Sequence, residues 1–182
     1  ISYSRRDETV MQRVVLFLRK RGFKVWVDNE KLKPGTSAWE AEIEQAIPKS
    51  FAIVVLLSPD AKKSEWVRRE ITLADQNQVR IYPLLVRGSE QNAIFLRLIA
   101  SQYTDIQGEK EEEGLNSICV ALESYFNELV EQKRDQEAAA KLEGEQKKLD
   151  IVKPEERQTK NIKADPDEEK FDQEKTIFSR LN

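Results

Sequence analysis

The chain has 182 residues, of which 39% are hydrophobic and 35% charged, and its formal net charge is −3. This length favours about one domain with a tail, and the slight acidic excess argues against nucleic-acid binding, which needs a concentrated basic face. There is no histidine, which excludes the commonest general base, the commonest zinc ligand and every serine–histidine or cysteine–histidine pair. The single cysteine, Cys119, excludes an intrachain disulfide and a thiolate metal cluster, and its apolar helical surroundings favour a core position.

The sequence contains no membrane or secretion signal. No stretch approaches the roughly 20 apolar residues that span a bilayer, and no signal-peptide pattern is present. One cysteine suits a reducing compartment, so we expect a cytoplasmic protein. Because Ile1 falls in the end of an apparent strand, we interpret the chain as a fragment with a truncated first strand, so a targeting segment could precede it.

The first elements alternate between strand and helix patterns. Residues 1–3 are typical of the end of a strand, and Asp7 is placed to cap a following helix. That helix has apolar residues at i, i+3, i+4 and i+7 spacing, and Gly22 occupies the position of a left-handed C-terminal cap. Residues 23–27 alternate with period two, which predicts a strand.

The middle of the chain predicts buried strands between helices. Residues 28–37 read as a loop with a Pro-Gly turn, and a helix is expected over 38–47. The continuous apolar run at 51–57 predicts a strand buried on both faces, as in a parallel sheet covered by helices.

The second half continues the alternation. Residues 65–77 predict a helix and 81–86 another buried strand, in which Pro83 should lie near an edge or a bulge because it cannot donate to the ladder. Three further elements are expected: a short helix at 94–99, a short strand at 103–106 and a closing helix at 114–129.

This order predicts an α/β domain with a parallel sheet of about five strands and helices on both faces. We assign the domain to residues 1–126. Residues 127–182 hold 12 Lys or Arg and 15 Asp or Glu, so this part carries the whole net charge. Its first part, 127–153, predicts a charged helical extension, and 154–182 a disordered linker.

Four ordered stretches resemble the Toll/interleukin-1 receptor (TIR) domain family. ISYSRRD is similar to its first conserved box, and GFKVWVDNEKLKPGTSAWEAEIEQAI to its second strand, BB loop and following helix. VVLLSPDAKKSEWVRREITLA resembles the third strand and helix, and IYPLLVRG the fourth strand. The resemblance implies a flavodoxin-like three-layer fold, and the Pro-Gly-Thr-Ser segment followed by Trp-Glu resembles prokaryotic members.

The resemblance implies two kinds of function. Some TIR domains are adhesive modules that assemble signalling complexes, whereas others cleave NAD+ at the nicotinamide–ribose bond, and some of these cyclise the product. We favour a cytoplasmic signalling protein that hydrolyses or cyclises NAD+ on assembly. The resemblance alone implies a role in bacterial defence or stress signalling. The alternatives are a non-enzymatic TIR–TIR interaction module and a secreted effector that interferes with host TIR signalling.

Glu70 is the candidate catalytic residue. Enzymatic members carry a Trp-x-x-x-Glu arrangement on the third helix, which matches Trp66 and Glu70, and residues at i and i+4 share a helix face. A fixed carboxylate stabilises the positive charge that develops on ribose as nicotinamide leaves. No metal and no cofactor is required, because NAD+ is the substrate. The alternative is a surface glutamate paired with Arg69 or Arg5, and Trp66 is a pocket wall, a core residue or both.

Three further residues are substrate-binding candidates. Ser4 and Arg5 follow the first strand, and ligands of open parallel sheets bind beyond the carboxyl ends of strands. Arg5 or the adjacent Arg6 could contact a phosphate or ribose of NAD+, with an ordinary surface arginine as the alternative. The resemblance matches Trp39 to a position that is aromatic in some NAD-cleaving members, where it would stack on a ring; otherwise it packs its helix onto the loop.

The loop tip is the candidate interaction site. In the family this loop mediates TIR–TIR contacts and borders the pocket, so the resemblance implies homotypic self-association, with a plain turn as the alternative. The expected partners are therefore NAD+ and other copies of the chain, with no nucleic acid and no membrane. No GxGxxG motif or P-loop is present, so the NAD+ hypothesis does not depend on a Rossmann fingerprint. The residues of the loop tip are Leu32, Lys33, Pro34 and Gly35.

Overall fold

The computed structural model describes residues 1–27, 37–99 and 101–158. It separates two units, residues 1–132 and 133–182, and α6 continues from the first into the second. None of the helices in the described ranges is both long and apolar enough to cross a membrane. The elements in chain order are η1 (Arg5–Asp7), α1 (Glu8–Lys20), α2 (Ser37–Ala46), β1 (Ala52–Leu57), α3 (Pro59–Lys63), α4 (Glu65–Gln76), β2 (Arg80–Leu85), α5 (Glu90–Ala93), η2 (Leu96–Leu98), β3 (Thr104–Asp105), η3 (Gly108–Lys110) and α6 (Glu111–Gln158).

The sheet of the first unit is parallel and has the order β1–β2–β3. All six residues of β1 pair in register with β2, beginning with Ala52 opposite Arg80. β3 adds two pairs, of which the first joins Thr104 to Leu84. These strands confirm the buried strands predicted at 51–57 and 81–86 and the α/β fold class with a parallel sheet.

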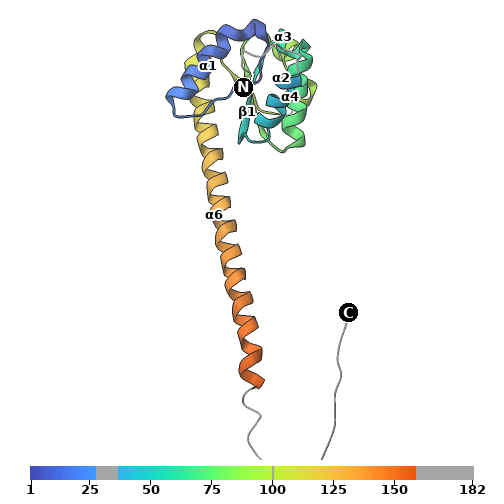
Figure 1. Cartoon of the computed structure of the whole chain (residues 1–182). Helices are drawn as coiled ribbons and strands as arrows, with labels where there is room; N and C mark the ends of the chain where they lie inside the picture. The colour runs from blue at the N-terminus through green and yellow to red at the C-terminus, as the bar shows by residue number, and fades with distance from the viewer. Residues whose placement is uncertain (28–36, 100, 159–182) are drawn as a thin grey trace, which may run out of the picture. The chain divides into compact units, whose positions relative to one another are not determined.

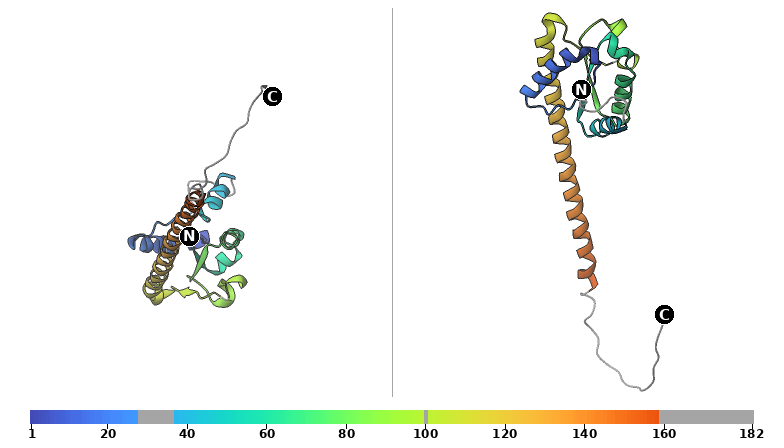
Figure 2. Two further views of the ribbon diagram at one scale, coloured as in Figure 1. Left: turned by 90° about the horizontal axis from the view of Figure 1, so that it is seen from below. Right: turned by 45° about the horizontal axis from the view of Figure 1, so that its top comes forward.

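Helices cover both faces of this sheet and enclose two hydrophobic cores. Successive side chains of a strand point to opposite faces, so β1 sends Ile53, Val55 and Leu57 into one core and Val54 and Leu56 into the other. The first core is completed by α2, α3, α4 and α5, and the second by α1 and the beginning of α6. Figures 1 and 2 show α1 and α4 on opposite sides of β1, which gives the three layers expected from the sequence.

The two ends of α1 differ in how well the sequence predicted them. Gly22 has a φ of +89°, and the N–H groups of Gly22 and Phe23 donate to the carbonyls of Arg19 and Leu18 at 3.0 and 3.1 Å. This is a Schellman motif and confirms the glycine cap. Asp7 holds the N-cap position, but its side chain makes no capping hydrogen bond. The predicted capping role of Asp7 is therefore wrong, because the carboxylate is bound elsewhere.

The strand predicted at 23–27 is not formed, and the described residues contain three paired strands rather than about five. The first residues of the chain contribute one isolated parallel bridge, between Ser2 and Val55. The backbone nitrogen of Ile1 donates to the Trp26 carbonyl oxygen at 2.8 Å. A strand requires a ladder of hydrogen bonds to a neighbouring strand. Among the described residues, 23–27 have no such ladder with residues 1–3.

Pro83 lies in β2, the central strand of the sheet. The position of its missing N–H faces β3, which does not pair with β2 at this residue. The Val86 N–H donates to the Leu57 carbonyl at 3.0 Å, so Val86 and every second residue before it face β1. Pro83 therefore faces the side of β3, and pairing with β3 begins one residue later, at Leu84. The proline thus occupies an edge position on that side, as its chemistry requires.

The helices predicted at 38–47 and 65–77 are confirmed as α2 and α4. In place of the helix predicted at 94–99 there is one 3-10 turn, η2, which follows the short helix α5. The closing helix, α6, begins at Glu111, continues through the helical extension predicted at 127–153 and reaches Gln158, which is five residues into the segment predicted as a linker. Residues 159–182 lie outside the described part of the chain.

Candidate active site

Glu70 points from α4 toward the sheet and is buried, with 8% of its surface exposed. Its Oε2 accepts a hydrogen bond of 2.5 Å from the Ser2 hydroxyl. Ser2 is fixed in turn, because its N–H donates to the Val54 carbonyl and its carbonyl accepts from the Leu56 N–H, both at 2.9 Å. This buried position differs from the exposed helix-surface glutamate that was the alternative interpretation.

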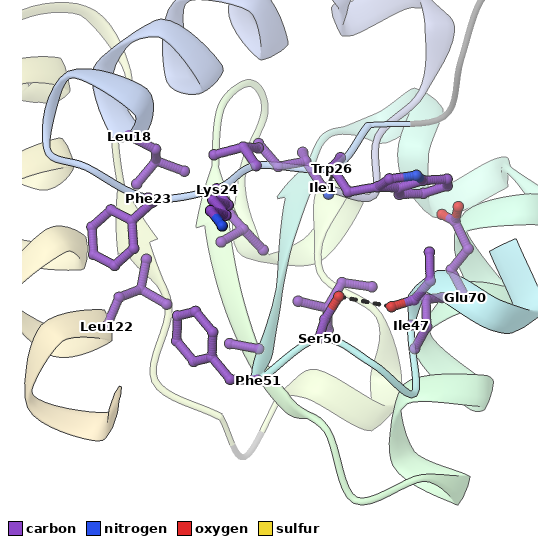
Figure 3. Close-up of a pocket in the computed structure, with 15 residues that line it drawn as sticks. Ile1, Leu18, Phe23, Lys24, Trp26, Ile47, Ser50, Phe51, Glu70 and Leu122 are labelled. Carbon is purple, nitrogen blue, oxygen red and sulfur yellow. Dashed lines mark hydrogen bonds between the residues drawn. The ribbon is translucent and has the colours of Figure 1, made fainter. Parts of the chain in front are cut away.

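A cavity of about 110 Å³ opens beside Glu70. Its walls are mainly apolar, and Lys24 and Ser50 add polar groups. In Figure 3, Trp26 and Glu70 lie at the same side of the cavity, and the Ser50 hydroxyl donates to the backbone carbonyl of Ala46, the last residue of α2, at 2.8 Å. The cavity is lined by Ile1, Leu18, Phe23, Lys24, Val25, Trp26, Ala46, Ile47, Ser50, Phe51, Ala52, Ile53, Val54, Glu70 and Leu122.

A groove of about 390 Å³ runs between α2 and α4 and also includes Glu70. Trp66 is half-buried, packs against the first core and lines this groove; that it forms the wall of a substrate pocket stays a prediction. The Arg69 guanidinium lies 5.0 Å from the centre of the Trp66 ring, a cation–π arrangement. The groove is lined by Ile43, Glu44, Trp66, Arg68, Arg69, Glu70, Thr72, Leu73 and Gln76. Glu70 thus borders both openings, and Trp66 shares its helix face as the spacing predicts.

A second polar cluster lies at the carboxyl edge of the sheet. Asp7 is only 4% exposed; its Oδ2 accepts from the Ser58 hydroxyl at 2.5 Å, and its Oδ1 accepts from Arg87 Nη2 at 2.9 Å. Arg87 also bridges to Asp60 at 2.5 Å, and Arg6 binds the same carboxylate at 3.2 Å. The cluster joins three segments of the chain. Arg6 and Asp7 come after the first residues, Ser58 and Asp60 after β1, and Arg87 after β2.

The electrostatics of this cluster follow from the shared arginine. The hydrogen bond from Arg87 holds the pKa of the Asp60 carboxyl below its ordinary value. Hydrogen bonds to Asp60 and then to Asp7 raise the pKa of the Arg87 guanidinium. Arg87 therefore remains charged and neutralises two carboxylates.

The structure does not bring Ser4 and Arg5, two of the predicted substrate-binding residues, to the openings beside Glu70. Ser4 is half-buried and accepts from the Asp7 N–H at 2.7 Å through its carbonyl oxygen, and Arg5 is exposed on η1. Neither residue lines the cavity or the groove beside Glu70. Trp39 belongs to α2, but its side chain lies outside what the structure describes, as does the whole loop tip of Leu32, Lys33, Pro34 and Gly35.

Ser2, Lys24 and Trp26 are site residues that the sequence interpretation missed. A signal for two of them was present, because Lys24 and Trp26 alternate with Phe23 and Val25, which pack against the second core. Period two places Lys24 and Trp26 on the other side of this segment. Nothing in the local sequence linked Ser2 to Glu70, which is 68 positions away.

Comparison with known families assigns the chain to one of them. The family model of the TIR domain matches residues 1–119, and the chain therefore belongs to the TIR domain family, whose members are modules of signal-transduction proteins. Human Toll-like receptor 6 is 28% identical over 138 residues, which cover 70% of this chain and 17% of the receptor. The chain thus spans less than a fifth of that relative's length.

A solved structure is also similar. The crystal structure of the TIR domain of the Toll-related receptor TRR-2 from Hydra magnipapillata is 27% identical, with a TM-score of 0.48 over 57% of this chain and 78% of that chain. Both of these relatives are animal receptors, and the prokaryotic subtype of this chain remains a prediction.

Proposed function

We propose that this TIR domain cleaves NAD+ at the bond between nicotinamide and ribose, with Glu70 as the catalytic residue. The observation that carries the proposal is the buried carboxylate of Glu70, which borders two openings and is held by a hydrogen bond from Ser2. A buried carboxylate is costly unless it is bound, so its position favours a functional role over a solvated helix surface.

The reaction needs little more than a fixed negative charge. The bond from ribose C1′ to the nicotinamide nitrogen breaks, and its electron pair neutralises the positive nicotinamide ring. Positive charge then develops on the ribose, and the Glu70 carboxylate stabilises it. Water adds to C1′ and loses a proton in hydrolysis, whereas in cyclisation a nucleophilic atom of the same molecule adds to C1′ and gives up its proton in the same way.

The surroundings of Glu70 supply groups for the rest of NAD+. Trp66 in the groove and Trp26 at the cavity offer aromatic faces for the planar rings of the substrate. Arg68 and Arg69, which line the groove beside Glu70, offer positive charge to the pyrophosphate. Ser4, Arg5 and Trp39 remain further candidates for substrate binding.

The test is release of nicotinamide from NAD+ by the chain at high concentration or tethered on beads, since we propose that assembly is required. Glu70→Gln removes the charge and keeps the size of the side chain, and we expect it to lower the rate about 100-fold or more. Glu112→Gln is the matched control, because Glu112 is an exposed glutamate on α6 that lines neither the cavity nor the groove. Equal rates for the wild type and Glu70→Gln would contradict the proposal.

The second candidate function is homotypic self-association without catalysis. Its support is family membership and the exposure of two apolar side chains at η2, Leu96 (86% exposed) and Ile99. Clustered exposed apolar groups are common at protein–protein contacts. Sedimentation velocity over a concentration series should show a dimer or larger species that Leu96→Asp weakens, whereas Val120→Asp, an exposed position on α6, should leave association unchanged.

A further inference from the structure

We propose that Ser2 is a positioning residue for Glu70 in NAD+ cleavage, an inference that rests on the proposed function. Its hydroxyl donates to Glu70 Oε2 at 2.5 Å. Ser2 was not among the residues expected to act from the sequence. Its role is to hold the carboxylate rather than to touch the substrate.

The backbone of Ser2, which carries the donating hydroxyl, is held in place by hydrogen bonds to β1. Ser2 is 1% exposed, and both of its backbone polar groups are bound to β1, at the Val54 carbonyl and the Leu56 N–H. The side chain has one rotatable bond before the oxygen, so little freedom remains for the donor. The hydrogen bond therefore joins the sheet to α4 at the carboxylate itself.

A fixed donor changes what the carboxylate can do. In a buried site few water molecules can solvate the charge, and a protein hydroxyl replaces one of them without moving during the reaction. Holding one oxygen also fixes the plane of the carboxylate, and small displacements of a catalytic group lower rates by about 100-fold. Groups that orient the ligands of a metal site typically contribute 10- to 100-fold, and we expect an effect of this order for the orientation of the Glu70 carboxylate.

The molecule contains a natural control for this contact. Ser58 donates to the buried carboxylate of Asp7, also at 2.5 Å, and Ser58 is fully buried. Removing the Ser58 hydroxyl deletes an equally short serine–carboxylate hydrogen bond that does not involve Glu70. It separates an effect on Glu70 from a general loss of packing or stability.

The experiment compares the wild type, Ser2→Ala, Ser2→Thr and Ser58→Ala for kcat and KM with NAD+, with circular dichroism and thermal melts to confirm folding. We expect Ser2→Ala to lower kcat 10- to 100-fold with KM within about twofold of the wild type. Ser2→Thr, which restores a hydroxyl, should recover most of kcat. Ser58→Ala should lower the melting temperature and keep kcat within about threefold.

Three outcomes would overturn the inference. An unchanged kcat in folded Ser2→Ala removes the positioning role and leaves the catalytic role of Glu70 intact. An equal loss of kcat in Ser58→Ala assigns the effect to general loosening. If the wild type itself consumes no NAD+, the proposed function fails and the inference fails with it.

A double-mutant cycle over Ser2→Ala and Glu70→Gln, measured by urea unfolding, tests the contact without any activity. We expect the two substitutions to be non-additive in the unfolding midpoint. Additive effects would show that the hydroxyl does not hold the carboxylate, which would also overturn the inference.

Discussion

Gly114 on α6 lies against the backbone of Asp105 on β3, so that a β-carbon at Gly114 would stand 2.7 Å from the Asp105 carbonyl oxygen and 2.6 Å from the Ile106 side chain. Helix and sheet can approach this closely only because the glycine has no side chain. The contact fixes the start of the closing helix on the second core.

We expect Gly114→Ala to lower the free energy of unfolding by about 1–3 kcal/mol, because overpacking outweighs the gain in helix propensity. Gly144→Ala is the matched control on the same helix, since a β-carbon there meets no atom within 4 Å. The control should be neutral or stabilising by up to about 1 kcal/mol. Urea unfolding measures both, and a stabilised Gly114→Ala would contradict the close approach.

Replacing Arg87 should lower the free energy of unfolding, because the buried Asp7 carboxylate would lose its charged partner. Arg87→Met keeps much of the side-chain volume and removes the charge that faces Asp7 at 2.9 Å. Because Asp7 is buried and Arg87 half-exposed, we expect a loss of about 2 kcal/mol in unfolding free energy. Arg6→Met, which removes an exposed partner of Asp60, should have a much smaller effect, and equal effects of the two would refute a special role of Arg87.

The stability contributed by Asp60 should depend on pH. Its pKa in the folded protein lies below the ordinary 3.8, first because of the hydrogen bond from Arg87. A lowered carboxyl pKa adds stability above the unfolded-state pKa and loses it as the pH falls through the folded-state value. The difference in stability between the wild type and Asp60→Asn should therefore be constant near neutrality and shrink below about pH 4. A difference that stays constant down to pH 2 would exclude this linkage.

Trp26 should contribute to substrate binding if NAD+ occupies the cavity beside Glu70. Trp26 is 36% exposed and lines that cavity. We expect Trp26→Ala to raise KM for NAD+ about fivefold, which corresponds to about 1 kcal/mol of ring contact. Trp26→Phe retains an aromatic face and should stay within about twofold. An unchanged KM for Trp26→Ala would place the substrate elsewhere.

Cys119 should be unreactive in the native protein. It is fully buried in the second core, and burial raises the pKa of its thiol, so little thiolate is present. At pH 8 we expect slow modification by a thiol reagent in buffer and rapid modification in urea. Fast native labelling would indicate that α6 opens readily from the domain.

The sequence identified those features whose signal is local. The apolar run at 51–57 marked a strand buried on both faces, and the i, i+4 spacing placed Trp66 and Glu70 together. At 23–27 the alternation predicted a strand that is not formed, because a strand also depends on a neighbour, which the local pattern does not reveal.

Contacts between distant residues were beyond the local signal. Ser2 and Glu70 are 68 positions apart, and Asp7 and Arg87 are 80 apart. Asp7 was predicted as a helix cap because it precedes α1, but tertiary partners compete for the same carboxylate. Polar residues just beyond the strands, Ser58 directly after β1 and Arg87 two residues after β2, are the pattern from which such a cluster could be anticipated.

The alternation of β1 has a consequence for how the first unit unfolds. Five consecutive buried residues supply both hydrophobic cores in turn, so one strand is the common wall of two compartments. Neither core can be loosened while the other stays intact, because each shares this backbone. The unit should therefore unfold in a single cooperative transition. Amide protons of α1 and of α4, which cover opposite faces of the sheet, should exchange with the same free energy of opening.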